Sequence, residues 1–285
     1  MTREIYLISE VGINHSGNLD FAKQMIKASA DAGMSAVKFQ KREISKCYTA
    51  AFLDSPRESP FGTTQRAQKE GLEFNHAQYL EIDRYCLELG IDWSASCWDL
   101  DSLEFITAFN PPWHKVASPM LGNKPLLRQI AAQKRKTFIS TGMCDWPELD
   151  AVVEIFRRAD CEFHLMHCVS EYPLADEKAN ILMIPRLIGR YGVKDMDGRV
   201  GYSGHETSLL KVCVAAVALG ATSIERHVTL NRASYGSDQS ASVECHALRD
   251  FVETIRAIPA ILGDGEKRIT DGEWAARKKL WVEAD

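Results

Sequence analysis

Short apolar runs alternate with longer segments of helical periodicity along most of the chain. Apolar or β-branched runs predict strands, and apolar residues that recur every three or four positions predict helices. Strands are expected at residues 5–10, 35–40, 91–96, 114–118, 137–140, 162–167, 198–203 and 221–227. Helices are expected at residues 18–33, 76–89, 99–109, 124–134, 147–159, 177–191, 209–220 and 242–262.

Eight strand–helix repeats of similar length predict an α/β protein with a single-domain (β/α)8 TIM barrel. A doubly wound open sheet gives the same alternation, but the first turn, residues 12–17, lacks the G-x-G-x-x-G pattern of such sheets. The barrel is expected to occupy residues 1–265, and residues 266–285 a charged tail that forms a surface helix with two tryptophans. A longer polar segment, residues 41–75, is expected to cross the barrel mouth.

Composition narrows the class of protein. The 285 residues are 45% hydrophobic, which suffices for a full core, and the formal net charge of -5 argues against nucleic acid or an anionic membrane as partner. No stretch reads as a signal peptide or a membrane span. The eight cysteines have no paired spacing. A reduced, cytoplasmic protein is therefore expected.

Two histidines follow the last two predicted strands. His205 stands just after residues 198–203, and His227 ends residues 221–227. Because all strands of a barrel end at one rim, both imidazoles would face the same mouth and could share a divalent cation through neutral nitrogens. The alternative is two unrelated histidines, one a cap and one a core residue bonded to a backbone carbonyl.

Further polar residues lie at the other predicted strand ends. They are Glu10, Lys38, Gln40, Ser96, Lys115, Ser118, Ser140, Ser170, Tyr172 and Ser203. A lysine inside an apolar strand is costly unless it meets an anion or a carboxylate. Lys38 and Lys115, with the serines, suit a ligand that carries both phosphate and carboxylate. Alternatively, the two lysines form structural ion pairs with Glu10 and another acid.

Seven stretches, in order along nearly the whole chain, carry a family resemblance. They are SEVGINHSG at 9–17, AVKFQ at 36–40, ISTGM at 139–143, HCVSEYP at 167–173, GYSGH at 201–205, IERHVT at 224–229 and GSD at 236–238. Together they resemble the sialic acid (N-acetylneuraminate) synthase family. The resemblance implies condensation of phosphoenolpyruvate (PEP) with an aldose, which gives a 3-deoxy-2-ulosonic acid and phosphate. It also implies a divalent metal ion, with Mn²⁺ the expected one.

The resemblance assigns roles to these residues. His205 and His227 become the metal ligands. The PEP cradle comprises Lys38, Ser96, Lys115, Ser118, Ser140, Ser170 and Ser203. Glu10, Gln40, Tyr172 and Asp238 match positions that face the sugar or the metal. The candidate catalytic residues are Glu10, Lys38, Lys115 and Asp238, with the two acids as proton carriers.

The sequence also departs from the family. Members usually carry a C-terminal antifreeze-like domain that reaches a dimer partner and supplies an arginine to the sugar, whereas this sequence stops where the linker would begin. A homo-oligomer is still expected. Residues 41–75 contain Arg57, Glu58, Arg66 and Lys69, which are candidates to replace that arginine, and this segment is expected to become ordered when sugar binds.

A second departure concerns the acceptor. Ser118-Pro119-Met120 stands where many relatives have Ser-Gly-Glu, so an aldose other than N-acetylmannosamine is expected. Two alternative functions stay open. One is a metal-dependent aldolase or lyase that uses pyruvate, which phosphate release would distinguish. The other is a catalytically silent sugar-binding paralogue.

Overall fold

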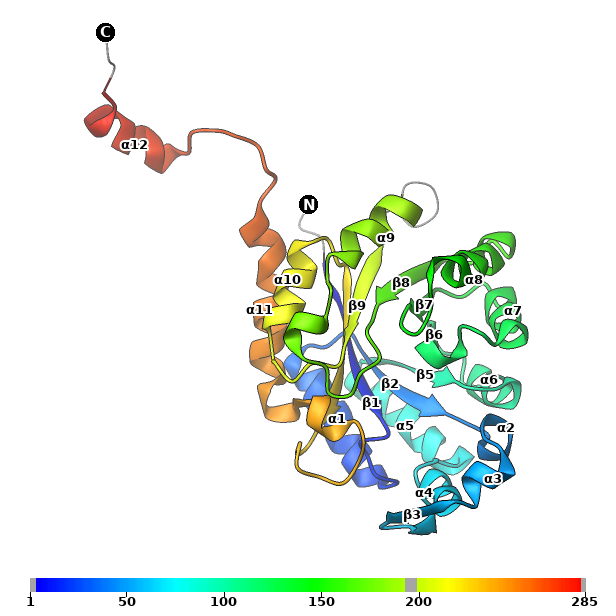
Figure 1. The fold of residues 1–285 in the computed structure, drawn as a ribbon. Coiled ribbons are helices and arrows are strands. Elements are labelled where there is room, and N and C mark those ends of the chain that lie inside the picture. The colour runs from blue at the N-terminus through cyan, green and yellow to red at the C-terminus, as the bar shows by residue number, and fades with distance from the viewer. Residues whose placement is uncertain (1–3, 193–198, 283–285) are drawn as a thin grey trace.

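The computed structural model describes residues 4–192 and 199–282, and in these residues eight parallel strands close into a barrel (Figure 1). The barrel strands are β1 (Tyr6–Gly12), β2 (Ala36–Lys41), β5 (Asp92–Cys97), β6 (His114–Val116), β7 (Thr137–Ser140), β8 (Phe163–His167), β9 (Val200–Gly204) and β10 (Ser223–Thr229). Pairing of β1 with β10 closes the ring and places Glu10 beside His227. The predicted (β/α)8 fold is confirmed.

Helices cover the outside of the barrel. They are α1 (Leu19–Ala32), α5 (His76–Leu89), α6 (Leu100–Thr107), α7 (Lys124–Ala132), α8 (Trp146–Arg158), α9 (Met183–Tyr191), α10 (Lys211–Ala218) and α11 (Leu248–Leu262). Local sequence sets their ends. The side chain of Asn18 accepts hydrogen bonds from the first turn of α1, and Gly33, with φ of 83°, ends that helix.

Two apolar clusters hold the barrel together. The larger lies between strands and helices. The smaller fills the barrel interior and comprises Ile8, Ala36, Trp113, Phe138 and Met166. Strand alternation separates the two, because successive side chains point to opposite faces. The interior cluster forms an apolar layer below the polar ends of the strands.

The segment from residue 41 to residue 75 is more structured than its polar sequence indicates. It contains the short helices α2 (Ile44–Cys47) and α3 (Ala50–Leu53), the hairpin strands β3 (Pro56–Ser59) and β4 (Gly62–Thr64), and the helix α4 (Gln65–Gly71). The antiparallel pairing of β3 with β4 folds this segment back on itself. We call residues 41–75 the mouth segment.

Two predicted helices begin later than expected. The helix expected at 177–191 is preceded by a 3₁₀ turn, Asp176–Lys178, and α9 begins only at Met183, because Asn180 adopts a left-handed φ of 46°. The helix expected at 242–262 begins at Leu248, because Val243–Glu244 instead pairs with β10 as strand β11. Gly198, the first residue of the predicted seventh strand, lies outside the described residues, and β9 begins at Val200.

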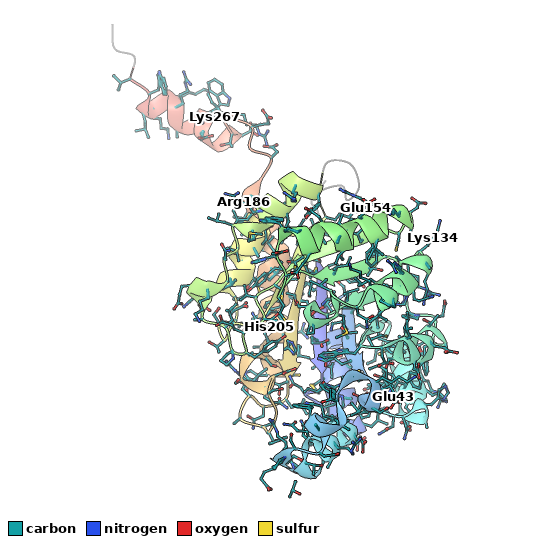
Figure 2. All side chains as sticks on the ribbon, turned by 45° about the vertical axis from the view of Figure 1, so that its right-hand side comes forward. Glu43, Lys134, Glu154, Arg186, His205 and Lys267 are labelled. Atoms are coloured by element: carbon teal, nitrogen blue, oxygen red, sulfur yellow. The ribbon has the colours of Figure 1, made fainter. Side chains whose placement is uncertain are left out.

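The tail forms helix α12 (Asp271–Leu280), which stands clear of the barrel in both views (Figures 1 and 2). Trp274 and Trp281 are 50% and 60% exposed, and each ring contacts the Arg277 guanidinium instead of the barrel. The division between barrel and tail at residue 265 stays a prediction. No helix in the described part of the chain is long and apolar enough to cross a membrane.

Candidate active site

A cavity of about 250 Å³ opens at the carboxyl ends of the strands, and every residue predicted to be catalytic, substrate-binding or metal-ligating lines it, whereas Arg57, Glu58 and Arg66 of the mouth segment do not. The predicted residues that line it are Glu10, Lys38, Gln40, Ser96, Lys115, Ser118, Ser140, Ser170, Tyr172, Ser203, His205, His227 and Asp238. Parallel strands of a barrel end at one rim, so residues far apart in sequence meet here. Their individual roles stay predictions.

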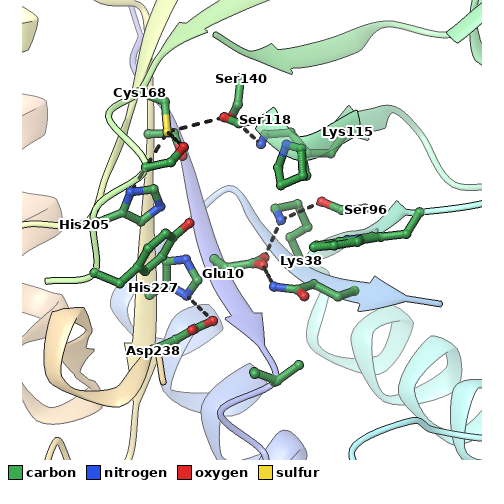
Figure 3. A pocket seen from close by; sticks show the side chains of 18 of the residues that line it. Glu10, Lys38, Ser96, Lys115, Ser118, Ser140, Cys168, His205, His227 and Asp238 are labelled. Carbon is green, nitrogen blue, oxygen red and sulfur yellow. Dashed lines mark hydrogen bonds and ion pairs between the residues drawn. The ribbon is translucent and has the colours of Figure 1, made fainter. Parts of the chain in front are cut away.

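Two lysines lie deep in the cavity. Lys38 Nζ donates to Ser96 Oγ at 2.9 Å and lies 2.6 Å from Glu10 Oε2. Lys115 Nζ donates to Ser140 Oγ at 2.7 Å. Both lysine side chains are 3% exposed. Figure 3 shows the lysines on one side of the cavity and the two histidines on the other, with Glu10 between them.

A second buried acid, Glu225, accompanies the lysines, and sequence reasoning missed it. Its Oε1 lies 3.8 Å from Lys38 Nζ and 3.5 Å from Lys115 Nζ, and it accepts a hydrogen bond from Ser203 Oγ at 3.1 Å. Strand alternation could have identified it, because Glu225 stands two residues before His227 and its side chain therefore points to the same face of the strand. The expected ion pairing of the lysines with Glu10 and another acid is therefore present, but inside the cavity.

The two acids differ in their affinity for protons. Burial and the neighbouring Glu225 carboxylate raise the pKa of Glu10 against the opposing effect of Lys38. Burial also disfavours the charged form of Glu225, but Lys115 and Lys38 outweigh it and hold its pKa low. When Glu10 holds a proton, two lysines face one carboxylate. Lys38, Lys115 and Glu225, which form the floor of the cavity, then carry a net positive charge that favours the binding of an anion.

The histidines are neutral and close together. Their ring centroids are 5.4 Å apart, and burial lowers the pKa of each to about 3. His205 Nδ1 lies 2.9 Å from the Val169 carbonyl oxygen, so it carries the proton and leaves Nε2 as a lone-pair donor. His227 Nδ1 is buried without a hydrogen-bond partner in the described residues and lies 3.6 Å from Asp238 Oδ2.

This donor set fits a divalent cation. Neutral imidazoles are common ligands of such ions, and a carbonyl bonded to the far nitrogen is their usual support. The described residues contain no preassembled group of three or more His, Cys, Asp or Glu ligands. His205 and His227 would therefore supply two of the ligands, with Asp238 beside them.

Comparison with known proteins identifies the family, because the NeuB family profile matches residues 25–267. The chain belongs to the NeuB family. It is 38% identical over 277 residues to human N-acetylneuraminate-9-phosphate synthase, across 96% of this chain and 76% of the human one. It is 30% identical over 281 residues to N,N'-diacetyllegionaminic acid synthase of Legionella pneumophila, across 95% and 77% of the two chains.

Solved structures agree with this assignment. The N-acetylneuraminic acid synthetase of Leptospira borgpetersenii, in complex with citrate, superimposes with a TM-score of 0.85 and 28% identity over 98% of this chain and 93% of that one. A DAHP synthase of Thermotoga maritima shares the fold alone, with a TM-score of 0.66, 13% identity and coverage of 90% and 70%. NeuB membership confirms the predicted enzyme of the sialic acid synthase type.

The serines of this NeuB-family protein are held by close backbone packing. Gly142 N donates to Ser118 Oγ at 3.1 Å. A Cβ on Gly142 would lie 2.4 Å from Ser170 Oγ and 2.8 Å from Ser118 Oγ. Glycine is therefore required where the turn after β7 approaches both hydroxyls.

On the acceptor side, the structure changes one expectation. Pro119 lines the cavity, whereas Met120 packs against the main core, so Met120 does not face the acceptor as its position suggested. Arg42, Tyr48 and Lys69 from the mouth segment line the cavity in its place, together with Trp98. Of these, only Lys69 was a candidate from the sequence. Arg42 and Trp98 directly follow the barrel strands β2 and β5, so their position at a strand end was an available signal, whereas the fold of the mouth segment brings Tyr48 to the cavity.

Proposed function

We propose that this NeuB-family protein condenses PEP with an aldose and releases a 3-deoxy-2-ulosonic acid and phosphate. One observation carries the proposal: Lys38 and Lys115 are buried in one cavity, each bonded to a serine of the next strand, opposite two neutral histidines. The names of the relatives, an N-acetylneuraminate-9-phosphate synthase and a legionaminic acid synthase, support it.

The floor of the cavity binds PEP in this proposal. Lys38 and Lys115 neutralise its phosphate and carboxylate, and the hydroxyls of Ser96, Ser118 and Ser140 donate hydrogen bonds to its oxygens. Charge-assisted bonds of this kind are about twice as strong as neutral ones. Glu225 keeps the lysines in place while no anion is bound, through its 3.5 Å and 3.8 Å contacts.

When bound, a divalent cation at His205 and His227, which we propose to be Mn²⁺, supplies Lewis acidity to the aldehyde oxygen of the aldose. Imidazole ligands favour such an ion over magnesium. The C2=C3 π bond of PEP supplies the electron pair for the new bond from C3 to the aldehyde carbon, and water adds at C2. The C2–O bond to phosphate then breaks as the C2 hydroxyl becomes the ketone and its proton passes to the departing phosphate. Glu10 is the proposed proton carrier, because its raised pKa lets it hold a proton and deliver it to the aldehyde oxygen. Asp238, beside His227, takes the proton from water.

The decisive experiment measures phosphate release from PEP with a panel of pentoses, hexoses and acetamido-hexoses, before and after removal of metal. We expect metal-dependent release with at least one of these aldoses; because Met120 does not face the cavity, N-acetylmannosamine is tested with the rest. His205→Ala should stop turnover while the circular dichroism spectrum stays that of the folded protein. Consumption of pyruvate without phosphate release would instead show an aldolase. No consumption of either compound would show a silent binding protein.

Two further properties stay proposals. A reducing, cytoplasmic location is supported by the eight cysteines, all of which are free thiols. A homo-oligomer is proposed from the family resemblance alone, and light scattering of the purified protein would test it.

A further inference from the structure

The two histidines of the cavity are held by the fold in different ways. His227 lies inside β10, where its backbone pairs with Glu10 of β1. His205 is the first residue beyond β9, and the last pair of the β9–β10 ladder is Gly204 with Arg226. Metal–ligand distances in proteins stay within about 0.2 Å of their usual values. A histidine on a turn therefore needs further support if it is to serve as a metal ligand.

Arg226 and Glu206 form a buried ion pair behind the histidines. Arg226 directly precedes His227, and Glu206 directly follows His205. Arg226 Nη1 donates to Glu206 Oε1 at 2.7 Å and to the Ser208 carbonyl oxygen at 3.1 Å, and its Nη2 donates to the Glu206 carbonyl oxygen at 2.6 Å. The two side chains are 1% and 0% exposed. One guanidinium thus ties the turn after β9 to β10. We call the Arg226–Glu206 pair the clamp.

The carboxylate of Glu206 is itself fixed in place. Tyr202 OH donates to its Oε2 at 2.8 Å, and the Cys213 thiol donates to its Oε1 at 3.5 Å. A Cβ on Gly204 would lie 2.3 Å from Oε2, so the carboxylate packs directly against the backbone that precedes His205. The residues on both sides of His205 are therefore in contact with one immobile carboxylate.

Stability alone does not explain an ion pair at this depth. Removing two charges from water costs about as much free energy as their attraction returns, and apolar side chains of similar volume often stabilise a core equally well. The clamp adds fixed direction, because a guanidinium and a carboxylate form hydrogen bonds in a set geometry. Neither residue lines the cavity, and the proposed PEP chemistry uses neither.

We propose that Arg226 and Glu206 are positioning residues, which set the spacing of His205 and His227 and thereby the affinity of this pair for a divalent cation. The inference rests on the proposed function, in which both histidines hold the cation. The clamp acts through the backbone, because Arg226 bonds to carbonyl oxygens of the turn that begins with His205. Replacement of residues that orient metal ligands typically changes metal affinity by about ten- to a hundredfold.

The test is a titration of the metal-free protein with Mn²⁺, in which electron paramagnetic resonance measures the free ion. Glu206→Gln keeps the volume of the side chain and removes its charge, and Arg226→Lys removes the planar fork. Each variant should bind Mn²⁺ at least about tenfold more weakly, with a calorimetric affinity for PEP within about twofold of the parent. Thermal unfolding of the metal-free proteins is measured alongside, since each variant also loses part of a buried ion pair.

Tyr202→Phe decides the question if both charge variants fail to fold. It deletes one hydroxyl that bonds to Glu206, and it should weaken Mn²⁺ binding at least about threefold, which is within the range of one hydrogen bond. Tyr191→Phe is the matched control. The Tyr191 hydroxyl also donates to a carboxylate that pairs with an arginine, Asp150 with Arg190, but this group lies on the outer helices α8 and α9.

The outcomes separate the clamp from the proposed function. Folded charge variants that bind Mn²⁺ as tightly as the parent would overturn the clamp, whatever their melting temperatures, as would equal Mn²⁺ affinity in the two tyrosine variants where the charge variants do not fold. Phosphate release from PEP by the parent would leave the proposed function standing in both cases. Weaker Mn²⁺ binding by the variants of a parent that turns over no aldose would support the clamp and contradict the PEP chemistry. A parent that binds no Mn²⁺ would contradict both.

Discussion

At the scale of single residues, strand β10 shows how one sequence serves two environments. Glu225 and His227 face the cavity, while Arg226 between them points outward and pairs with Glu206 at 2.7 Å, both almost fully buried. The period of two along a strand decides which residues can do chemistry. The sequence predicted that His227 ends this strand; β10 instead runs on to Thr229, yet His227 still lines the cavity. Glu225, which lies in the middle of the strand, was not predicted.

Lys115 offers a direct test of the floor. Replacing it with methionine keeps most of the stem volume and removes the charge, so PEP affinity should fall by about 1.5–3 kcal/mol, the size of a hydrogen bond to a charged group. Calorimetric titration with PEP measures this loss. The variant also leaves Glu225 with Lys38 as its remaining lysine neighbour, so thermal unfolding is measured alongside. A lower melting temperature with unchanged PEP affinity would mean that Lys115 serves structure alone.

At the scale of elements, helix ends that are fixed by near neighbours in sequence could be predicted, whereas helix ends that depend on distant contacts could not. Asn18 and Gly33 bound α1 as expected, because capping acts through bonds between near neighbours. The late start of α11 was not predictable in this way. Ser242 Oγ accepts from Asn14, 228 positions away, and Val243 pairs with β10, so distant contacts hold that stretch out of the helix. The elements of the mouth segment escaped prediction for a different reason, since they are short and their polar sequence has no clear period, although β3 and β4 pair locally.

The turn between β7 and α8 supports an element-scale prediction. Gly142→Ala places a methyl group against the hydroxyls of Ser118 and Ser170, which must then move. Displacement of binding groups by about 1 Å can cost up to about a hundredfold in rate, so the KM of PEP should rise at least about tenfold. Steady-state kinetics measures this. Gly122→Ala, where a Cβ meets nothing within 4 Å, is the control, and equal kinetics for the two variants would contradict the prediction.

At the scale of the whole molecule, the eightfold repeat was readable because each unit repeats one simple pattern, and it brought every residue predicted to be catalytic, substrate-binding or metal-ligating to one rim. The burial of titratable groups makes the free energy of unfolding depend on pH. The histidines His15, His164, His205 and His227 all have pKa values lowered by burial, to about 3 or 4. They are neutral in the folded protein at neutral pH.

This burial predicts acid lability. His15 stacks on Phe74 with ring centroids 4.0 Å apart, and burial lowers its pKa to about 3. The unfolded chain protonates it near its ordinary pKa of about 6.5, so stability present above pH 6.5 is lost as pH falls towards 3. His15 alone should cost about 2 kcal/mol at pH 5 relative to pH 8. Urea unfolding of the parent and of His15→Asn tests this, since the variant should lose less stability on acidification. Parallel curves would exclude His15.

The division of the cavity between strands and the mouth segment has a consequence for how such enzymes diversify. The floor residues Lys38, Lys115 and Glu225 belong to strands whose register the whole barrel fixes. Arg42 and Lys69 belong to an excursion that folds largely on itself. On the proposed function, substitutions in the mouth segment are expected to change the acceptor while the strand lysines stay in place, whereas changes in the strands are expected to affect the binding of PEP. New acceptor sugars are therefore expected to arise through substitutions in the mouth segment, while the proposed formation of the carbon–carbon bond at the strand ends stays unchanged.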